Sequence, residues 1–312
     1  MSNVRRVLLI LLGPALLLSG LALAACAGEG KQEVIIVVQP TSTAAELTAQ
    51  AGEIERFLEE RVDVDIQLIF PTTYAGVIEA LRFGHAQAAF MSAWPSTLAN
   101  KYAGAEVVLA EVREVIIDGE KQEAPYYFSY WVVLKDSPYT GLQELSGKRA
   151  AFPSPLSTSG YVAPVARLLE LGLIGSADGQ ADPKQFFDEV FFAGGYAQSW
   201  EALKQGQADV AVIAGDVPDE LFREVLANTR VLEQQGPIPS HAVVFSKDLK
   251  DPVRSKLRDA LLELGEPQYR DIMRKFISGI FVRFEPTTTE EHLASLSRFL
   301  EATGLAFSET LR

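Results

Sequence analysis

The sequence predicts an α/β protein divided into two lobes. Short apolar runs of strand type alternate with amphipathic helical runs along most of the chain, which is the pattern of α/β folds. Two long extended segments, one after the other, interrupt this alternation before the middle of the chain. The alternation then restarts. With 312 residues and 48% hydrophobic content, the chain can bury a core in each lobe. We expect the C-terminal helices to return to the first lobe.

The first lobe is expected to begin with the apolar strand Val34–Val38, which stops before Pro40. Thr41 and Ser42 are suited to cap the amphipathic helix that follows. The other elements expected here are a helix over 44–61, a strand over 64–69, a helix over 74–83 that Thr72 and Thr73 open and Gly84 closes, a strand over 86–91, and a helix entered through Ser92-Ala93-Trp94-Pro95.

The second lobe is expected to follow two extended segments, 107–117 and 126–135, which the turn Asp118-Gly119 separates. Its expected strands cover 149–152, 190–192 and 209–213, and its expected helices cover 159–171 and 197–205. A last strand over 242–245 precedes a region expected to hold helices only, at 252–264, 267–278 and 289–302.

These elements place the first lobe at 32–125 plus 242–312 and the second at 140–237, with crossovers at 126–139 and 238–241. Ligands of open α/β sheets bind at the carboxyl ends of the strands. The loops after residues 38, 69, 152, 192 and 213 are therefore expected to face one cleft.

The N-terminus has the features of a lipoprotein signal peptide. Arg5 and Arg6 precede an apolar run that ends in Leu23-Ala24-Ala25-Cys26, so we expect residues 1–25 to be removed and 26–31 to form a tether. Acylation of Cys26, the one cysteine of the chain, would supply two acyl signals and hence a stable anchor. The alternative is an uncleaved membrane span, for which about 18–20 apolar residues suffice.

The charge of the chain excludes some partners. Removal of residues 1–25 takes away two arginines and no acids, so the formal net charge changes from −13 to −15. Such an acidic surface disfavours nucleic acid and anionic lipid as partners. We expect contact with the membrane through the lipid anchor only, and a monomer.

A cluster of hydroxyl residues, Ser157-Thr158-Ser159-Gly160, precedes the apolar residues Tyr161 to Ala163. Such a cluster indicates a helix start, where unpaired backbone N–H groups and the positive end of the helix dipole favour an anion. No lysine or arginine lies within the motif, so selectivity would come from hydrogen bonds. Ordinary helix capping is the alternative interpretation.

Several motifs together resemble the phosphonate-binding subunits of ABC importers, in order and spacing from Val34 to Val244. They are Tyr74-Ala75-Gly76-Val77-Ile78-Glu79-Ala80-Leu81-Arg82-Phe83-Gly84, Tyr127-Phe128-Ser129, Lys135-Asp136-Ser137-Pro138, and Pro155-Leu156-Ser157-Thr158-Ser159-Gly160-Tyr161 with Pro164. The resemblance implies a two-lobed periplasmic-binding-protein fold of the type II class. Its ligand, a small phosphorus oxyanion such as phosphonate, phosphite or phosphate, would bind in the cleft between the lobes and pass to a permease with its ATPase.

The resemblance also implies roles for individual residues. Ser157, Thr158 and Ser159 would hold the oxyanion, while Tyr74 and Tyr127 would close over it. Tyr196 stands where relatives have a histidine. Trp94 is a further candidate, either as a ligand lid or as a core aromatic.

At the far end of the pocket, relatives that bind aminophosphonates use two acids to hold an ammonium. Asp216 matches one of these acids, although it could instead cap the helix that follows, and His241 stands at the position of the other. We expect His241 to be neutral near pH 7 and cationic below about 6.5. A ligand without an amine is therefore expected to bind better than 2-aminoethylphosphonate.

Other classes of protein are less well supported by the sequence. Ser157 lacks the G-x-S-x-G pattern of serine hydrolases, and His85, His241 and His292 show no triad order. Paired His or Cys metal ligands at helical spacing are missing from the sequence, so we expect neither an enzyme nor a cofactor. A lipoprotein that reports its ligand to a sensor kinase, or a binder of another small oxyanion, remains an alternative.

Overall fold

The computed structural model describes residues 31–39, 44–117, 120–177 and 180–303. Residues Gln32–Arg312 form one compact unit. The expected signal peptide, the Cys26 lipidation site, the Thr41 and Ser42 cap and the Asp118-Gly119 turn lie outside the described residues. None of the helices in the described ranges is long and apolar enough to cross a membrane.

The first lobe is built on a sheet with the strand order β14-β4-β13-β3-β1-β2, and β5 pairs with β4. Its strands are β1 (Glu33–Val38), β2 (Asp65–Ile69), β3 (Ala88–Met91), β4 (Glu106–Ile117), β5 (Glu120–Ala124), β13 (Ala242–Phe245) and β14 (Phe281–Pro286). Strand β1 runs parallel to β2 and β3, whereas β13 is antiparallel to β3 and β4.

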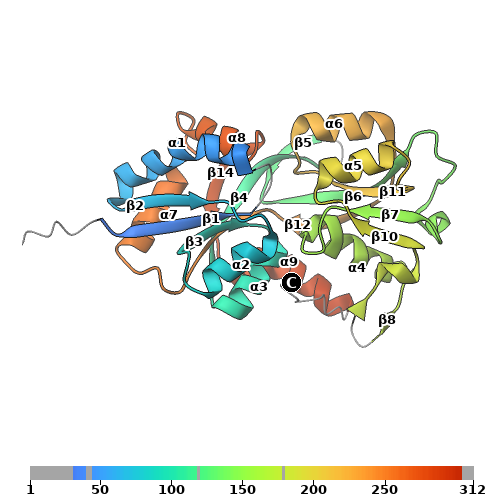
Figure 1. Cartoon of the computed structure of the whole chain (residues 1–312), viewed down its shortest axis with the longest axis horizontal. Helices are drawn as coiled ribbons and strands as arrows, with labels where there is room; N and C mark the ends of the chain where they lie inside the picture. Colours follow the sequence, from blue (N-terminus) through green and yellow to red (C-terminus); the bar gives the residue numbers. More distant parts are fainter. Residues whose placement is uncertain (1–30, 40–43, 118–119, 178–179, 304–312) are drawn as a thin grey trace, which may run out of the picture. The chain divides into compact units, whose positions relative to one another are not determined.

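Helices cover both faces of this sheet (Figure 1). Helices α1 (Ala44–Val62), α7 (Val253–Glu263) and α8 (Arg270–Phe276) lie on one face, and α2 (Tyr74–Arg82) and α3 (Ala93–Ala103) lie on the other. Thr73 caps α2, since its hydroxyl accepts from the Gly76 N–H at 3.1 Å. The start of α2 expected from Thr72 and Thr73 is therefore confirmed.

The second lobe has a sheet of order β10-β7-β11-β6-β12. Its strands are β6 (Tyr126–Leu134), β7 (Arg149–Phe152), β10 (Glu189–Phe192), β11 (Val210–Ala214) and β12 (Thr229–Pro239). Helix α4 (Ala163–Glu170) lies on one face, and α5 (Tyr196–Lys204) and α6 (Asp219–Asn228) lie on the other (Figure 1). The smaller elements are η1 (Leu142–Leu145), η2 (Thr158–Val162), η3 (Pro183–Gln185) and the hairpin of β8 (Ser176–Ala177) and β9 (Gln180–Ala181).

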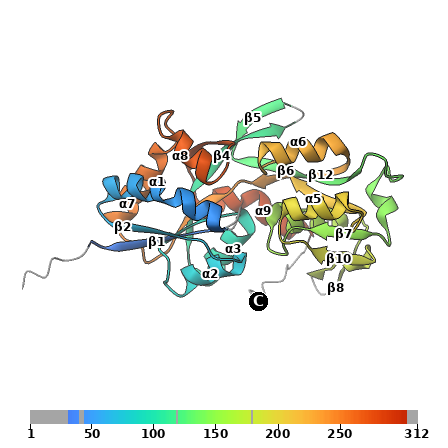
Figure 2. The ribbon, with the colours of Figure 1, turned by 45° about the horizontal axis from the view of Figure 1, so that its top comes forward.

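The chain passes between the two sheets at two adjacent places. One is the step from β5 to β6, and the other is the step from β12 to β13. They lie side by side, because the Ser240 N–H donates to the Pro125 carbonyl at 2.9 Å. Helix α9 (Thr289–Thr303) contacts α3 and β4 of the first lobe and α4 and β12 of the second. In Figure 2, α9 lies between the helices of the two lobes.

The extended segment expected over 126–135 is strand β6, which is hydrogen-bonded to β11 and to β12. One expectation about the elements is wrong. The region after Phe245 was expected to be helical throughout, but it contains β14, which is antiparallel to β4. Strand β14 is short and carries Arg283 and Glu285 among its apolar residues, so its strand character depends on pairing with β4.

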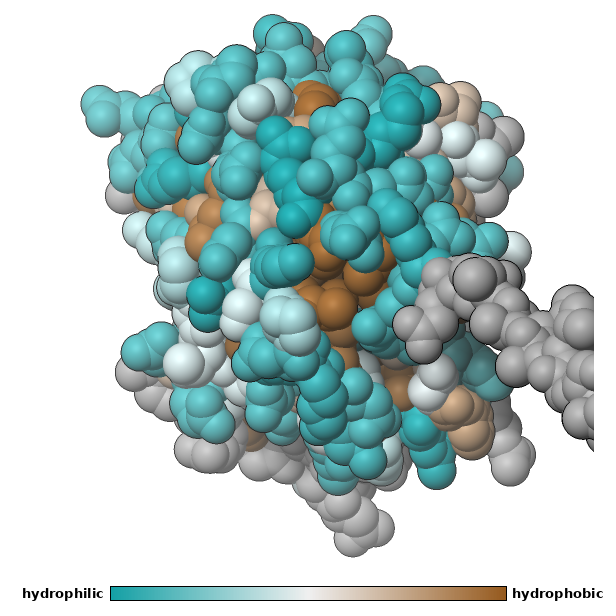
Figure 3. Space-filling view, turned by 90° about the vertical axis from the view of Figure 1, so that its left-hand side faces the viewer, coloured by the Kyte–Doolittle hydropathy of each residue, from teal (hydrophilic) through white to brown (hydrophobic). Residues whose placement is uncertain are grey.

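The face of the molecule shown in Figure 3 is largely hydrophilic, with apolar side chains visible near its centre. This distribution agrees with the strongly negative formal charge of the chain, −13. Most apolar side chains of the described residues lie in the interior. They form three buried clusters, which follow the helix-covered faces of the two sheets.

Candidate functional site

The starts of four helices meet between the two sheets. Tyr74 is the first residue of α2, Trp94 the second of α3, Thr158 the first of η2 and Tyr196 the first of α5. Each of these elements follows the carboxyl end of a strand or the loop after it. Backbone N–H groups at helix starts lack partners within the helix, and the helix dipole adds positive potential there. Such a convergence favours an anion.

The hydroxyl cluster is joined to two tyrosines. The Tyr127 hydroxyl, on β6, donates to Ser159 Oγ at 2.9 Å. The Tyr196 hydroxyl lies 2.7 Å from Ser159 Oγ and 3.3 Å from Ser157 Oγ. Ser157, Ser159 and Tyr127 are buried, and Tyr196 is half-buried. Folding of β6, η2 and α5 against one another therefore brings together four of the phenols and serines expected in the site.

Ser157 also caps its own helix. Its hydroxyl accepts from the Gly160 N–H at 3.0 Å, and its carbonyl accepts from the N–H groups of Tyr161 and Val162 at 3.0 and 3.1 Å. The helix expected over 159–171 thus begins with the wider turn of a π-helix, η2, before α4. The capping interpretation holds for Ser157, but it does not account for the contacts of Thr158 and Ser159.

Gly160 permits the close packing of this turn. A Cβ atom at this position would lie 2.7 Å from Ser157 Oγ and would also overlap the ring of Pro153. Carbon and oxygen atoms without a bond between them do not approach so closely in real structures. A glycine in the motif is therefore required by the positions of the Pro153 ring and the Ser157 hydroxyl.

The first lobe contributes a parallel set of contacts. Gln39, after β1, accepts through Oε1 from the N–H and the hydroxyl of Ser92 at 3.0 and 3.1 Å. The Gln39 side chain also acts on Tyr74, whose pKa it lowers against the effects of burial and of Asp216. The Trp94 N–H donates to Thr158 Oγ1 at 2.8 Å, which joins α3 of the first lobe to η2 of the second. The loops after β1, β3 and β7 are thus linked to one another. The loops after β1 and β7 were among those expected to face one cleft, whereas the loop after β3 was not.

A buried ion cluster that the sequence analysis missed lies beside the hydroxyls. Arg113, on β4, donates through Nε to Glu111 Oε2 at 2.8 Å and through Nη1 to Asp216 Oδ2 at 2.7 Å. Only 1%, 2% and 8% of the Glu111, Arg113 and Asp216 surfaces are exposed. The available signal was the pair Glu111 and Arg113, two residues apart and hence on one face of a mostly apolar strand.

Asp216 therefore has a partner within the protein. Helix α6 begins at Asp219 with Pro218 as its N-cap, and the Asp216 carboxylate pairs with Arg113. Burial raises the pKa of Asp216, while the charge of Arg113 acts in the opposite direction. Burial also raises the pKa of Glu111 against the effect of Arg113.

The three tyrosines remain protonated hydrogen-bond donors near neutral pH. Burial, followed by the negative charge of Asp216, raises the pKa of Tyr74 to about 12. The same two causes raise the pKa values of Tyr127 and Tyr196 well above their ordinary range. A phenol that keeps its proton can donate to an anionic ligand.

His241 lies at the edge of this cluster, with Nε2 4.0 Å from Asp216 Oδ2. Burial lowers the pKa of His241 well below 6.5, and the nearby positive charge of Arg113 lowers it further. The expectation that His241 becomes cationic below about 6.5 is therefore wrong. Sequence alone did not reveal that a guanidinium is its neighbour.

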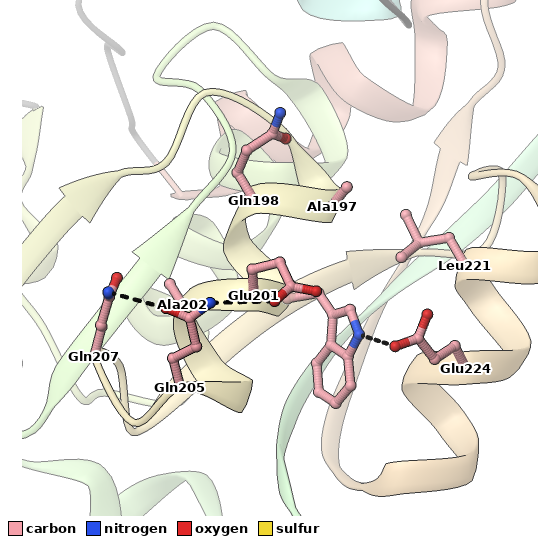
Figure 4. A pocket seen from close by; sticks show the side chains of 9 residues that line it. Ala197, Gln198, Glu201, Ala202, Gln205, Gln207, Leu221 and Glu224 are labelled. Carbon is pink, nitrogen blue, oxygen red and sulfur yellow. Dashed lines mark hydrogen bonds between the residues drawn. The ribbon is translucent and has the colours of Figure 1, made fainter.

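A hollow of about 360 Å³ lies on the second lobe between α5 and α6, apart from the hydroxyl cluster. Figure 4 shows Glu201 and Glu224 at this hollow, with the indole of Trp200 donating to Glu224 at 2.8 Å. The two carboxylates disfavour an anion there. Among the described residues, no three His, Cys, Asp or Glu side chains are grouped as a metal site.

The strand order, the two adjacent crossovers and the site between the sheets define a two-lobed type II periplasmic-binding-protein fold, as expected. The solved structure of a binding protein component of an ABC phosphonate transporter from Pseudomonas aeruginosa is similar, with a TM-score of 0.72 and 20% identity, covering 88% of each chain. The sequence model of the family "ABC transporter, phosphonate, periplasmic substrate-binding protein" matches residues 36–292. This chain belongs to that family.

Two curated relatives are similar in sequence. The "Phosphate-import protein PhnD" of Mycolicibacterium smegmatis is 28% identical over 183 residues, which cover 58% of this chain and 55% of the relative. The "Phosphonates-binding periplasmic protein" of Escherichia coli is 26% identical over 226 residues, which cover 70% of this chain and 62% of the relative. The matches thus span somewhat more than half the length of each relative.

Proposed function

We propose that this protein is the extracytoplasmic solute-binding protein of an ABC importer and that it binds a small phosphorus oxyanion. The observation that carries this proposal is the convergence of four helix starts and a cluster of hydroxyls from both lobes at one place. Hydrogen-bond donors and helix dipoles aimed at one point suit a compact tetrahedral anion. Family membership supports the same class of protein.

Within this proposal, the second lobe supplies most of the donors. The hydroxyls of Ser157, Thr158 and Ser159 and the N–H groups of η2 hold the oxygens of the anion. Tyr127 donates its one proton to Ser159, which leaves the Ser159 proton for the anion. The protonated phenol of Tyr196, which contacts Ser157 and Ser159, donates to the oxygens of the anion. The relatives named for phosphate import and for phosphonate binding support phosphate, phosphite or a phosphonate as the ligand class.

The first lobe closes the site. Trp94 and Tyr74 come from α3 and α2, and the Trp94 N–H already reaches Thr158. The two neighbouring crossovers, joined by the bond from Ser240 to Pro125, form the hinge about which the lobes separate and close. The closed pair of lobe surfaces then docks on the permease, which receives the ligand unchanged. This role requires neither catalysis nor a cofactor.

The same proposal includes the attachment to the membrane. Cys26 directly follows Leu23-Ala24-Ala25, so acylation of its thiol and cleavage before it would leave a monomeric lipoprotein on a short tether. Two acyl chains anchor a protein stably, whereas one chain binds only marginally.

Calorimetric titration of the purified protein tests the proposed ligand class. The panel consists of phosphate, phosphite, methylphosphonate and ethylphosphonate, with sulfate and acetate as controls. We expect at least one phosphorus oxyanion to bind with one-to-one stoichiometry and more tightly than both controls. Equal or stronger binding of sulfate, or no binding by any phosphorus oxyanion, would contradict the proposal.

A further inference from the structure

The ion pair between Arg113 and Asp216 crosses from one lobe to the other. Arg113 lies on β4 of the first sheet, and Asp216 follows β11 of the second. Both side chains are almost completely buried, with 3% and 7% of their surfaces exposed. Taking such charges out of water is expensive unless each finds a partner. The Arg113 guanidinium finds two, because Glu111 binds its other side.

Asp216 is the acid that faces the proposed oxyanion site. Its charge acts on Tyr74, Tyr127 and Tyr196, the three phenols of the site. His241 approaches it to 4.0 Å and is neutral because of burial and the charge of Arg113. The cation that pairs with Asp216 is thus the side chain of Arg113, and His241 supplies no second positive charge.

We propose that Arg113 is a specificity-determining residue, which occupies the Asp216 carboxylate and so makes the site select phosphorus oxyanions that carry no cationic group. This inference rests on the proposed function. An ammonium on the ligand would have to displace the guanidinium from Asp216 or remain unpaired. Displacement would break the 2.7 Å bond from Arg113 to Asp216 and leave the guanidinium with Glu111 as its one acidic partner. An ammonium that did not displace Arg113 would be buried without a partner, which is costly.

Two ligands of matched size test this inference. Ethylphosphonate and 2-aminoethylphosphonate share the phosphonate and the two-carbon chain, and they differ in the ammonium. We expect the unmodified protein to bind ethylphosphonate at least about tenfold more tightly than 2-aminoethylphosphonate, since the ammonium must compete with Arg113 for the Asp216 carboxylate or stay without a partner.

The variants are chosen so that the protein keeps its charge balance. Arg113→Met alone leaves two buried carboxylates unpaired and risks unfolding. The double variant Glu111→Gln/Arg113→Met removes one charge of each sign and leaves Asp216 as the available acid. We expect it to shift the ratio of the two dissociation constants by about tenfold or more toward 2-aminoethylphosphonate. Arg113→Lys keeps a cation at this position and should keep most of the original preference.

Arg149→Met is the matched control. Arg149 also pairs with an aspartate, Asp209, at 2.9 Å, but at the amino end of β7 and away from the hydroxyl cluster. In the Arg149→Met variant, the ratio of the dissociation constants for ethylphosphonate and 2-aminoethylphosphonate should equal that of the unmodified protein. Near-equal binding of the two ligands by the unmodified protein, or an unchanged ratio in the double variant, overturns the role of Arg113 while leaving the proposed function standing. Failure of the unmodified protein to bind either ligand or inorganic phosphate overturns both.

Discussion

The backbone N–H of Trp94 donates a 2.8 Å hydrogen bond to the Oγ1 atom of Thr158. Trp94 belongs to α3 of the first lobe, and Thr158 begins η2 of the second. A hydroxyl has one proton and two lone pairs, so Thr158 can accept from Trp94 and still donate its own proton to an anion. One side chain can therefore hold the ligand and link the lobes at the same time.

Loss of either hydroxyl should weaken oxyanion binding without unfolding the protein. Ser157→Ala and Thr158→Ala each remove one donor to an anion. A charge-assisted hydrogen bond contributes about 1.5–3 kcal/mol, or about tenfold to a hundredfold in affinity. Calorimetric titration with the best ligand of the panel measures the loss. Ser154→Ala, in the same loop but bonded to Leu156, is the control. Unchanged affinity in both variants would reduce the motif to helix capping.

Gly160→Ala should impair binding through the shape of the η2 turn. The added Cβ would meet Ser157 Oγ at 2.7 Å and the Pro153 ring, and overpacking of this kind costs about 1–3 kcal/mol of unfolding free energy. Because Ser157 must move, ligand affinity should fall as well. Urea unfolding and ligand titration measure the two effects.

Gly279→Ala is the control for this substitution. A Cβ at Gly279 meets no atom within 4 Å, so its unfolding free energy should stay within about 0.5 kcal/mol of the unmodified value. Full ligand affinity in Gly160→Ala would show that the close approach of Gly160 does not position Ser157.

His292 should make the protein less stable in mild acid. Its Nε2 donates to the Ser240 carbonyl at 3.0 Å beside the crossover, and burial lowers its pKa to about 4. The unfolded chain, with a histidine pKa near 6.5, binds more protons between these two values. The free energy of unfolding therefore falls as the pH falls, by about 2 kcal/mol from pH 7 to pH 5 for this residue.

Urea unfolding of His292→Gln at pH 7 and pH 5 checks this contribution. Glutamine keeps an N–H donor for Ser240 and does not titrate. The free energy of unfolding of His292→Gln should therefore fall between pH 7 and pH 5 by about 2 kcal/mol less than that of the unmodified protein. The other histidine with a lowered pKa, His241, is present in both proteins and cancels in the comparison. An identical pH dependence in the two proteins would show that His292 is not held neutral by burial.

Cys26→Ser should release the protein from the membrane or leave it as an unprocessed precursor. The sequence holds no other cysteine to acylate, and a serine cannot form the thioether anchor. Fractionation of cells and the mass of the mature N-terminus distinguish these results. Cleavage after Ala25 together with continued membrane association would require a different anchor.

Local patterns were enough to predict most elements. The apolar strand at 34–38, the Thr73 cap and the amphipathic helices depend on side chains a few residues apart, so the sequence by itself determined them. The alternation of these elements also predicted the two-lobed α/β fold, which the family match and the solved relative confirm. The hydroxyl motif indicated a helix start, since Ser157 and Gly160 interact within one turn.

Contacts between distant segments were decided only by the tertiary structure. Strand β14 exists because β4 pairs with it, and the protonation of His241 depends on Arg113, which lies far away in the chain. Arg113 and Asp216 are separated by 103 residues. In the sequence, neither residue can be distinguished from an ordinary charged side chain. Their meeting requires both sheets to form and close on each other, because only burial gives a charge pair its large energetic consequence.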